Sequence, residues 1–238
     1  MKIETKIYSE IGSRPENEDS IRVKNENGIL LAVIADGLGG HGRGKEASQI
    51  AVQTVMQKID SSTEFSEDSL EDAIIFANRV ICNEQKNESE MKTTVAALWI
   101  KGNYAIVSNI GDSRVYRIRN GVIDFHTDDH SKAYIAYQFG EIKYDQIAAH
   151  PDQNKLTRCL GSNQCVSLDT SVIDVISDDI FILCSDGFWE LLSCKEIEDI
   201  VCSSENLNQL FNRFCQKVLY STRANRDNCT FAIVTVVN

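Results

Sequence analysis

Short apolar runs separated by turn residues predict a chain that is rich in β-strands. The run Ile29–Ala35 is apolar without interruption, which is typical of a strand that is buried on both faces. Apolar and polar residues alternate at Ile3–Ser9 and Ser20–Val23, as in strands with one exposed face. Further runs with strand character lie at 93–100, 103–110, 113–119, 121–125, 167–176, 180–187 and 229–237.

Turn residues indicate how these strands connect. The four runs between 93 and 125 are predicted to form a meander, in which Asn120-Gly121 is a strong hairpin signal. The runs 167–176 and 180–187 are predicted to pair with each other across a short turn. Residues 128–162 show little periodicity, so a long loop with a short helix is expected there.

Helical spacing of apolar residues predicts helices at 47–59 and 67–85. Ser193 and Glu196 form a possible capping box, which predicts a short helix, and a longer helix is expected after it at 207–219. Many antiparallel strands with two pairs of helices predict an α+β fold, in which two packed antiparallel β-sheets are flanked by pairs of helices as an α-β-β-α sandwich. No linker or repeat divides the sequence, so residues 1–238 are predicted to form a single domain.

The overall composition argues against several classes of protein. Of the 238 residues 42% are hydrophobic, and no apolar run approaches the ~20 residues needed to cross a bilayer. The eight cysteines include no C-x-x-C pair, so we expect reduced thiols in a cytoplasmic protein rather than a zinc site. The net charge of −11 argues against nucleic-acid binding and suits a protein that gathers divalent cations.

Four aspartates lie where apolar strands end or begin. Asp36 ends "LLAVIA", Asp186 ends "IFILCS", Asp227 precedes "NCTFAIVTVV", and Asp112 lies between two strands. If these strand ends are neighbours, the carboxylates repel one another unless a cation lies among them, and carboxylate ligands favour Mg²⁺ or Mn²⁺. Taken singly, each aspartate could instead bond its own backbone in a glycine-rich turn. The pattern alone leaves both interpretations open.

Seven short blocks carry a resemblance to a known family. They are "GSRPENED", "VIADGLGGHGRGKEAS", "SNIGDSRVYRIRNG", "TDDHS", "HPDQNKLTRCLGS", "ILCSDGFWELL" and "RDNCTFAIV". In these blocks the sequence resembles the metal-dependent protein phosphatase family, the type 2C serine/threonine phosphatases, in its compact bacterial form. The blocks keep the family's order and span residues 12–234, so the resemblance covers nearly the whole chain.

The resemblance implies a phosphatase catalytic domain that hydrolyses phosphomonoesters without a covalent intermediate, using a hydroxide that bridges two divalent cations, Mn²⁺ or Mg²⁺. Asp36 would bridge the two ions, and the backbone carbonyl of Gly37 would bind one of them. Asp186 and Asp227 would complete the protein ligands of the other ion. Gly37 could also be no more than a turn glycine.

Further acidic residues are implied around these ligands. Glu18 would reach the metals largely through water, with Asp19 supporting it. Asp112 would help to hold a third, weaker ion. Glu190 stands where many relatives have an aspartate near that ion, which leaves the third site open.

Two residues are implied in the chemical step. Arg14 matches the position that grips the substrate phosphate, although an arginine in an acidic loop can also be a surface ion pair. Many relatives have a histidine where this chain has Leu38, so His41 is the nearest candidate for the general acid. His41 could equally be a loop residue before the next helix, in which case metal-bound water would be the acid. Ser131–His150 corresponds to the family's mobile flap, and the remaining histidines are expected to pack in loops.

The implied substrates are phosphorylated proteins, including a serine/threonine kinase, and the enzyme is expected to be a monomer with no nucleic-acid or membrane partner. Two other classes stay open. One is a non-catalytic relative that keeps the fold as a binding module, and the other is a hydrolase of small phosphorylated metabolites. The presence of Asp36, Asp186 and Asp227 argues against the binding module.

Overall fold

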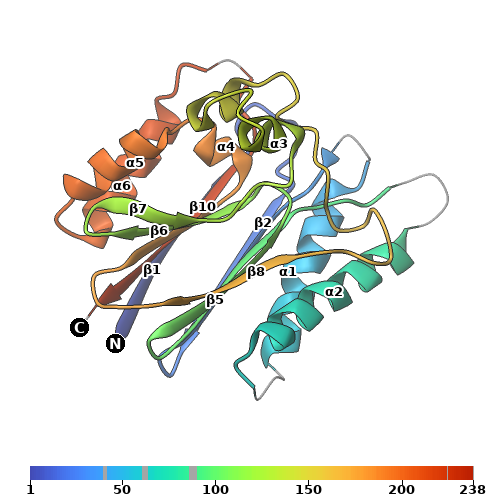
Figure 1. Cartoon of the computed structure of the whole chain (residues 1–238), viewed down its shortest axis with the longest axis horizontal. Helices are drawn as coiled ribbons and strands as arrows, with labels where there is room; N and C mark the ends of the chain where they lie inside the picture. The colour runs from blue at the N-terminus through green and yellow to red at the C-terminus, as the bar shows by residue number, and fades with distance from the viewer. Residues whose placement is uncertain (40–41, 61–63, 86–89, 224, 238) are drawn as a thin grey trace.

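Two antiparallel sheets of five strands each pack face to face in the computed structural model of the chain (Figure 1). The structure describes residues 1–39, 42–60, 64–85, 90–223 and 225–237. Sheet A has the strand order β1 (Lys2–Glu10), β10 (Cys229–Val237), β9 (Ile180–Cys184), β6 (Arg114–Arg119) and β7 (Val122–His126). Sheet B has the order β2 (Asp19–Glu26), β3 (Ile29–Asp36), β4 (Val95–Lys101), β5 (Tyr104–Ile110) and β8 (Asp169–Asp174).

Helices cover the outer face of each sheet (Figure 1), so the predicted α-β-β-α sandwich is confirmed. The outer layers are α1 (Gly44–Asp60) and α2 (Glu67–Glu84) on sheet B, and α5 (Cys194–Cys202) and α6 (Leu207–Leu219) on sheet A. The segment 128–162 contains two short helices rather than the one predicted, α3 (Lys132–Gln138) and the 3₁₀ helix η2 (Tyr144–Ala149). A single helical turn, α4 (Asp186–Trp189), follows β9. No helix in the described ranges has both the length and the apolar character to cross a membrane.

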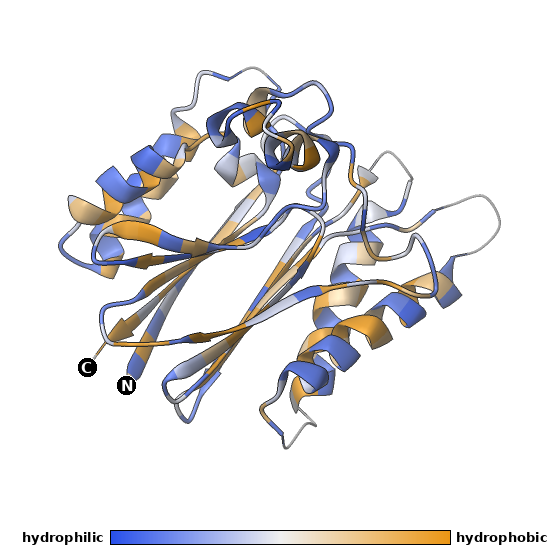
Figure 2. Cartoon of the chain, in the orientation of Figure 1, coloured by the Kyte–Doolittle hydropathy of each residue, from blue (hydrophilic) through white to orange (hydrophobic). Residues whose placement is uncertain are grey.

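Apolar side chains form three layers, one between the sheets and one under each pair of helices. Leu30 and Phe181 are fully buried between the sheets. Under α6, the rings of Phe214 and Phe231 lie 6.0 Å apart. Figure 2 shows the central strands as mostly hydrophobic and the outer helices as mixed. Central strands face an apolar layer on both sides, which explains why Ile29–Ala35 is apolar without interruption.

Two of the predicted strand connections are wrong, because the chain changes sheet where a hairpin is predicted. β5 lies in sheet B and β6 in sheet A, so the predicted meander is two pairs joined by a crossing at 111–113. β8 pairs with β5 at the edge of sheet B, whereas β9 lies between β10 and β6 in sheet A. The turn between them bonds to both sheets, since the Val175 N–H donates to the Asn103 carbonyl (2.8 Å) and the Asp178 N–H donates to the Val236 carbonyl (2.8 Å). A short turn suits both a hairpin and a crossing between sheets. The apolar residues of β9 are buried along almost the whole strand, as its position in the middle of sheet A requires.

The register of the strands gathers several strand ends at one end of the sandwich. In sheet B, Asp19 at the start of β2 lies opposite Asp36 at the end of β3. In sheet A, Cys184 at the end of β9 pairs with Arg114 at the start of β6 and with Phe231 near the start of β10. Residues just beyond these ends are therefore brought close together.

Candidate metal centre

A pocket of about 500 Å³ opens where these strand ends meet, and both sheets contribute to it. The structure brings the predicted metal-site residues together there, including Gly37. Arg14 is the only basic residue among the described lining residues. The acidic lining residues are Glu16, Glu18, Asp36, Asp112, Asp186 and Asp227.

β3 carries Asp36 to the pocket, and two buried threonines hold its peptide groups. The Asp36 N–H donates to Thr94 Oγ1 (2.9 Å). The Asp36 carbonyl accepts hydrogen bonds from Thr93 Oγ1 (2.7 Å) and from the Thr94 N–H (2.9 Å). Because the backbone is bonded on both sides of this residue, any adjustment of Asp36 is confined to its side chain.

A close contact with backbone requires glycine at position 37, whereas the close contact at Gly39 is with the flexible end of the Glu18 side chain. A Cβ atom at Gly37 would lie 2.2 Å from the Gly44 carbonyl oxygen, and a Cβ atom at Gly39 would lie 2.0 Å from Glu18 Oε2. Glycine therefore allows the start of α1 to return to the end of β3. This packing is sufficient to explain Gly37, so its carbonyl as a metal ligand stays a prediction.

The carboxyl groups in the pocket destabilise one another's charged forms. Burial, followed by the nearby Asp186, raises the pKa of Asp36 well above its usual range. Burial, followed by Asp112 and Asp227, does the same to the pKa of Asp186. Asp186 Oδ1 is buried and has no hydrogen-bond partner among the described residues. An unpartnered buried carboxylate oxygen is costly unless a cation binds it, so this donor set fits a hard divalent cation.

The predicted ligand side chains do not converge on a single point. Within the described ranges, no three histidine, cysteine, aspartate or glutamate side chains form a ready-made metal cluster. The Asp227 carboxylate instead binds the Arg14 guanidinium through two bonds, from Nε to Oδ1 (2.8 Å) and from Nη2 to Oδ2 (2.5 Å). The residue predicted to grip phosphate thus neutralises a predicted metal ligand.

Asp112 lies in the crossing between β5 and β6, which several bonds hold in place. The Asp112 carbonyl accepts a hydrogen bond from Trp189 Nε1 (2.9 Å). Two bonds join His130 to Gly111, the residue before Asp112. The Gly111 N–H donates to His130 Nδ1 (3.1 Å), and the His130 N–H donates to the Gly111 carbonyl (2.8 Å), so this histidine packs within the loop, as predicted. Burial and the nearby Asp129 raise the pKa of Asp112 to about 7.

Asp19 connects the two sheets beside the pocket. Ser185 Oγ donates to Asp19 Oδ2 (2.8 Å) and accepts a hydrogen bond from the Thr230 N–H (3.0 Å). Burial raises the pKa of Asp19 to about 6, although its bonds to Thr230 and Ser185 oppose the rise. Asp19 therefore links the start of β2 to the end of β9 and the start of β10.

The three remaining residues of the sequence prediction, Glu18, Glu190 and His41, do not share one location. Glu18 lines the pocket, and burial raises its pKa. Glu190 is not among the described lining residues, and its carboxylate contacts Gln153 and Arg223, the latter at 2.6 Å. His41 lies outside the described residues, so its role as general acid stays a prediction.

Sequence reasoning missed the side chains that hold the predicted ligands. Thr93, Thr94, Ser185 and Asn228 are buried polar residues next to the ends of apolar strands. Burying a polar group is costly unless it is hydrogen-bonded. Polar residues at the ends of apolar strands are therefore a signal, visible in the sequence, of buried hydrogen bonds. Their partners lie far away along the chain and cannot be read from it.

Comparisons with known proteins return one family. The chain matches the family model of protein phosphatase 2C over residues 8–227. It is 31% identical over 230 residues to the serine/threonine phosphatase stp of Listeria monocytogenes serotype 4b, which covers 93% of this chain and 90% of that protein. It is 30% identical over 252 residues to the protein phosphatase PhpP of Streptococcus pneumoniae serotype 2, with 98% of each chain covered.

Solved structures with the same fold agree with this family. The phosphatase MsPP of Mycobacterium smegmatis, solved in complex with cacodylate, superposes with a TM-score of 0.84 at 28% identity, covering 98% of each chain. The catalytic domain of the serine/threonine protein phosphatase PstP, solved with two manganese ions, superposes with a TM-score of 0.83 at 26% identity, covering 99% of each chain.

Proposed function

Because the chain belongs to the protein phosphatase 2C family and is a metal-dependent serine/threonine phosphatase, we propose which residues bind its metals. Asp36, Asp186 and Asp227 hold two divalent cations, Mn²⁺ or Mg²⁺, together with the Gly37 carbonyl. Glu18 reaches them through water. The observation that best supports this assignment is the unpartnered, buried Asp186 Oδ1 among carboxyl groups of raised pKa.

A third ion is proposed at Asp112. This carboxyl group lines the same pocket, and burial raises its pKa to about 7. A cation at this position would compensate the charge that burial disfavours. Glu190, bound by Gln153 and Arg223, is not proposed as a ligand.

Two divalent cations at these carboxylates would lower the pKa of a water molecule for in-line attack on phosphorus. The chain itself binds the phosphate and returns a proton to the leaving serine or threonine oxygen. We propose that Arg14 leaves Asp227 and pairs with two phosphate oxygens, which its planar guanidinium favours. His41 is the proposed proton donor, because the unperturbed pKa of a histidine side chain, about 6.5, suits general acid catalysis.

Phosphorylated proteins are the substrates of this family. We propose that a serine/threonine kinase is among them, and that the enzyme acts as a monomer in the cytoplasm. We also propose that residues 1–238 work as one catalytic domain, since sheet A and sheet B supply carboxylates to one pocket. The net charge of −11 supports a protein that binds neither nucleic acid nor an anionic membrane.

Hydrolysis of a phosphothreonine peptide tests this proposal. The purified protein is assayed with Mn²⁺, with chelator, and as the Asp186→Asn variant, beside a set of small phosphorylated metabolites. Metal-dependent activity that collapses in Asp186→Asn and favours the peptide supports it. Activity that ignores both chelator and substitution contradicts the metal assignment. A higher kcat/KM on a metabolite contradicts the substrate class.

A further inference from the structure

One buried side chain holds the segment that carries two of the proposed site residues. Asn228 precedes β10 and is only 5% exposed. Its Nδ2 donates to the Ile11 carbonyl (2.8 Å) and to the Glu16 carbonyl (2.9 Å). Its Oδ1 accepts a hydrogen bond from the Glu18 N–H (2.8 Å). Both N–H donors and the carbonyl of this amide are therefore committed to the segment 11–18.

These three bonds fix the segment on both sides of Arg14. The segment is bonded at its beginning through Ile11 and at its end through Glu16 and Glu18, so Arg14 lies between the anchors. The Asn228 N–H also donates to Asp227 Oδ1 (2.8 Å), the same oxygen that the Arg14 guanidinium contacts. Asn228 thus holds both the segment that carries Arg14 and the carboxylate to which Arg14 binds.

The surrounding backbone cannot shift to replace these bonds. A Cβ atom at Gly12 would lie 2.1 Å from the Asp227 carbonyl oxygen, and a Cβ atom at Gly187 would lie 2.1 Å from the Asn228 carbonyl oxygen. The Ser13 N–H also donates to the Arg226 carbonyl (2.9 Å). The backbone at 226–228 is therefore packed on two sides. Losing the Asn228 side chain removes the bonds to the Glu16 carbonyl and the Glu18 N–H, and it leaves the Ile11 carbonyl with only the longer bond from the Arg14 N–H (3.4 Å).

We propose that Asn228 is a positioning residue, which sets the reach of Arg14 to the phosphate by clamping the segment 11–18 onto the start of β10. The inference rests on the proposed function, because it takes Arg14 as the phosphate-binding residue. Asn228 itself is not proposed to contact the substrate, since the segment occupies its amide. An error of about 1 Å in the placement of a binding group is enough to cost much of its contribution.

The molecule contains a matched control for this clamp. Asn78 in α2 is fully buried and also makes three bonds to a loop. Its Nδ2 donates to the carbonyls of Asn163 (2.8 Å) and Gln164 (3.3 Å), and its Oδ1 accepts from the Gly161 N–H (2.8 Å). None of these loop residues is among the described residues that line the pocket. Asn78→Ala therefore removes an equivalent set of bonds to residues outside the pocket lining.

The experiment compares Asn228→Ala with Asn78→Ala at saturating Mn²⁺. We expect both variants to melt at a lower temperature than the wild type. Only Asn228→Ala should raise the KM for a phosphothreonine peptide and the inhibition constant of inorganic phosphate, each by about tenfold. In an Arg14→Ala background the effect of Asn228→Ala on phosphate should disappear, because the clamp acts through Arg14.

Equal KM and inhibition constants for the two asparagine variants would overturn the proposal, as would an unchanged Asn228 effect in the Arg14→Ala background. If Asn228→Ala does not fold, Asn228→Asp replaces it, because this variant keeps the acceptor for the Glu18 N–H and loses both donors. Amide hydrogen exchange separates the two claims. Faster exchange at Glu18 in Asn228→Ala shows the clamp even if the wild type lacks metal-dependent activity, in which case the proposed function fails. Unchanged exchange at Glu18 in Asn228→Ala overturns the clamp itself.

Discussion

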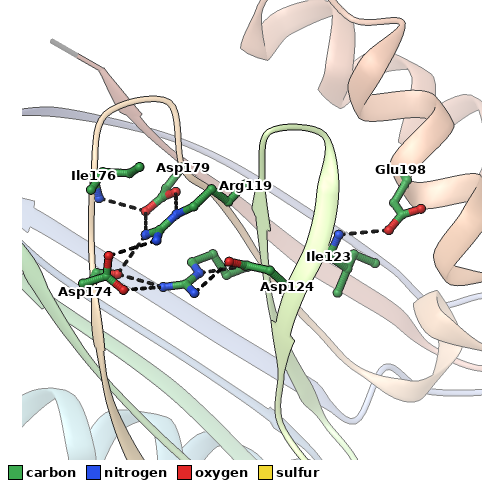
Figure 3. A network of polar contacts seen from close by, with 8 residues as sticks. Arg119, Ile123, Asp124, Asp174, Ile176, Asp179 and Glu198 are labelled. Carbon is green, nitrogen blue, oxygen red and sulfur yellow. Dashed lines mark hydrogen bonds and ion pairs between the residues drawn. The ribbon is translucent and has the colours of Figure 1, made fainter.

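Two groups of aspartates lie at opposite ends of the sandwich and meet opposite electrostatic conditions. β6 begins beside the pocket and ends in an arginine network, where two of its arginines pair with three aspartates (Figure 3). Arg117 pairs with Asp124 (2.9 Å) and Asp174 (3.2 Å). Arg119 pairs with Asp174 (2.9 Å) and Asp179 (2.8 Å). Each of these carboxylates has a guanidinium partner.

The pocket holds a larger group of carboxylates with Arg14 as the only basic residue among its described lining residues. Hydrogen bonds from Arg119, supported by Arg117, lower the pKa of Asp174, whereas burial and Asp129 raise the pKa of Asp112 to about 7. The comparison shows how a structural acidic cluster differs from the proposed metal-binding one. Arginines of the protein neutralise the first cluster, whereas the second keeps an excess of negative charge, which is what the proposed metal site requires.

The largest expected effect comes from Asp36→Asn. The substitution keeps the size of the side chain but removes the charge proposed to bridge two ions. We expect kcat/KM on a phosphopeptide to fall by more than ~100-fold, because even the loss of a supporting partner of a metal ligand costs about 10–100-fold. Steady-state kinetics across a Mn²⁺ titration measures this. Activity that returns to the wild-type level at high Mn²⁺ would show a weakened site rather than a lost bridge.

Replacing Arg14 with alanine should move two quantities in opposite directions. Phosphate loses its bidentate partner, so the KM for a phosphopeptide should rise about tenfold or more. Asp227 loses a competing cation, so Mn²⁺ should bind more tightly, by a few-fold. Calorimetric titration of Mn²⁺ in the absence of substrate checks the second effect. Weaker Mn²⁺ binding by the variant would mean that Arg14 supports the metals instead of competing with them.

The two groups also predict opposite dependences of stability on pH in the metal-free protein. The pKa of Asp112 is about 7 in the folded state and about 3.9 in an unfolded chain, so the folded state holds the extra proton between these values. Its contribution to stability is therefore present at low pH and lost as the pH rises through about 7. The pKa of Asp174 is lowered, so its contribution is present above its ordinary pKa and lost as the pH falls through the folded value.

With chelator present, we therefore expect the melting temperature to fall between about pH 5 and pH 7.5, since the pocket carboxyls dominate this range. Asp112→Asn should make the fall shallower. Thermal denaturation followed by circular dichroism measures both. A melting temperature that rises across the interval would contradict the raised pKa values in the pocket.

The smallest expected effect is that of Asp174→Asn, which removes a partner of both Arg117 and Arg119. Its carboxylate is 57% exposed, so solvent screens most of its interaction with the arginines. We expect metal-dependent activity within about twofold of the wild type and a smaller change in melting temperature than Asp112→Asn produces. The same assays apply. A loss of activity comparable to that of Asp36→Asn would remove the distinction between the two groups.

Much of the fold and of the site could be predicted from local signals. Uninterrupted apolar runs located the central strands, and aspartates at strand ends located the pocket lining. The sheet to which β8 and β9 belong could not be predicted, because a short turn fits both a hairpin and a crossing between sheets. The Arg14–Asp227 ion pair joins residues 213 positions apart, and the bonds of Asn228 are similarly distant in sequence. Such contacts depend on the packed structure and leave no local pattern.

The most direct test of the account is calorimetric titration of Mn²⁺ into the wild type, Asp186→Asn and Asp174→Asn. These two substitutions remove one carboxylate from the pocket and one from the arginine network. The account predicts that the wild type and Asp174→Asn bind Mn²⁺ alike and that Asp186→Asn loses at least one ion. Equal binding by all three proteins would contradict the claim that the unbalanced carboxylates of the pocket form the metal centre.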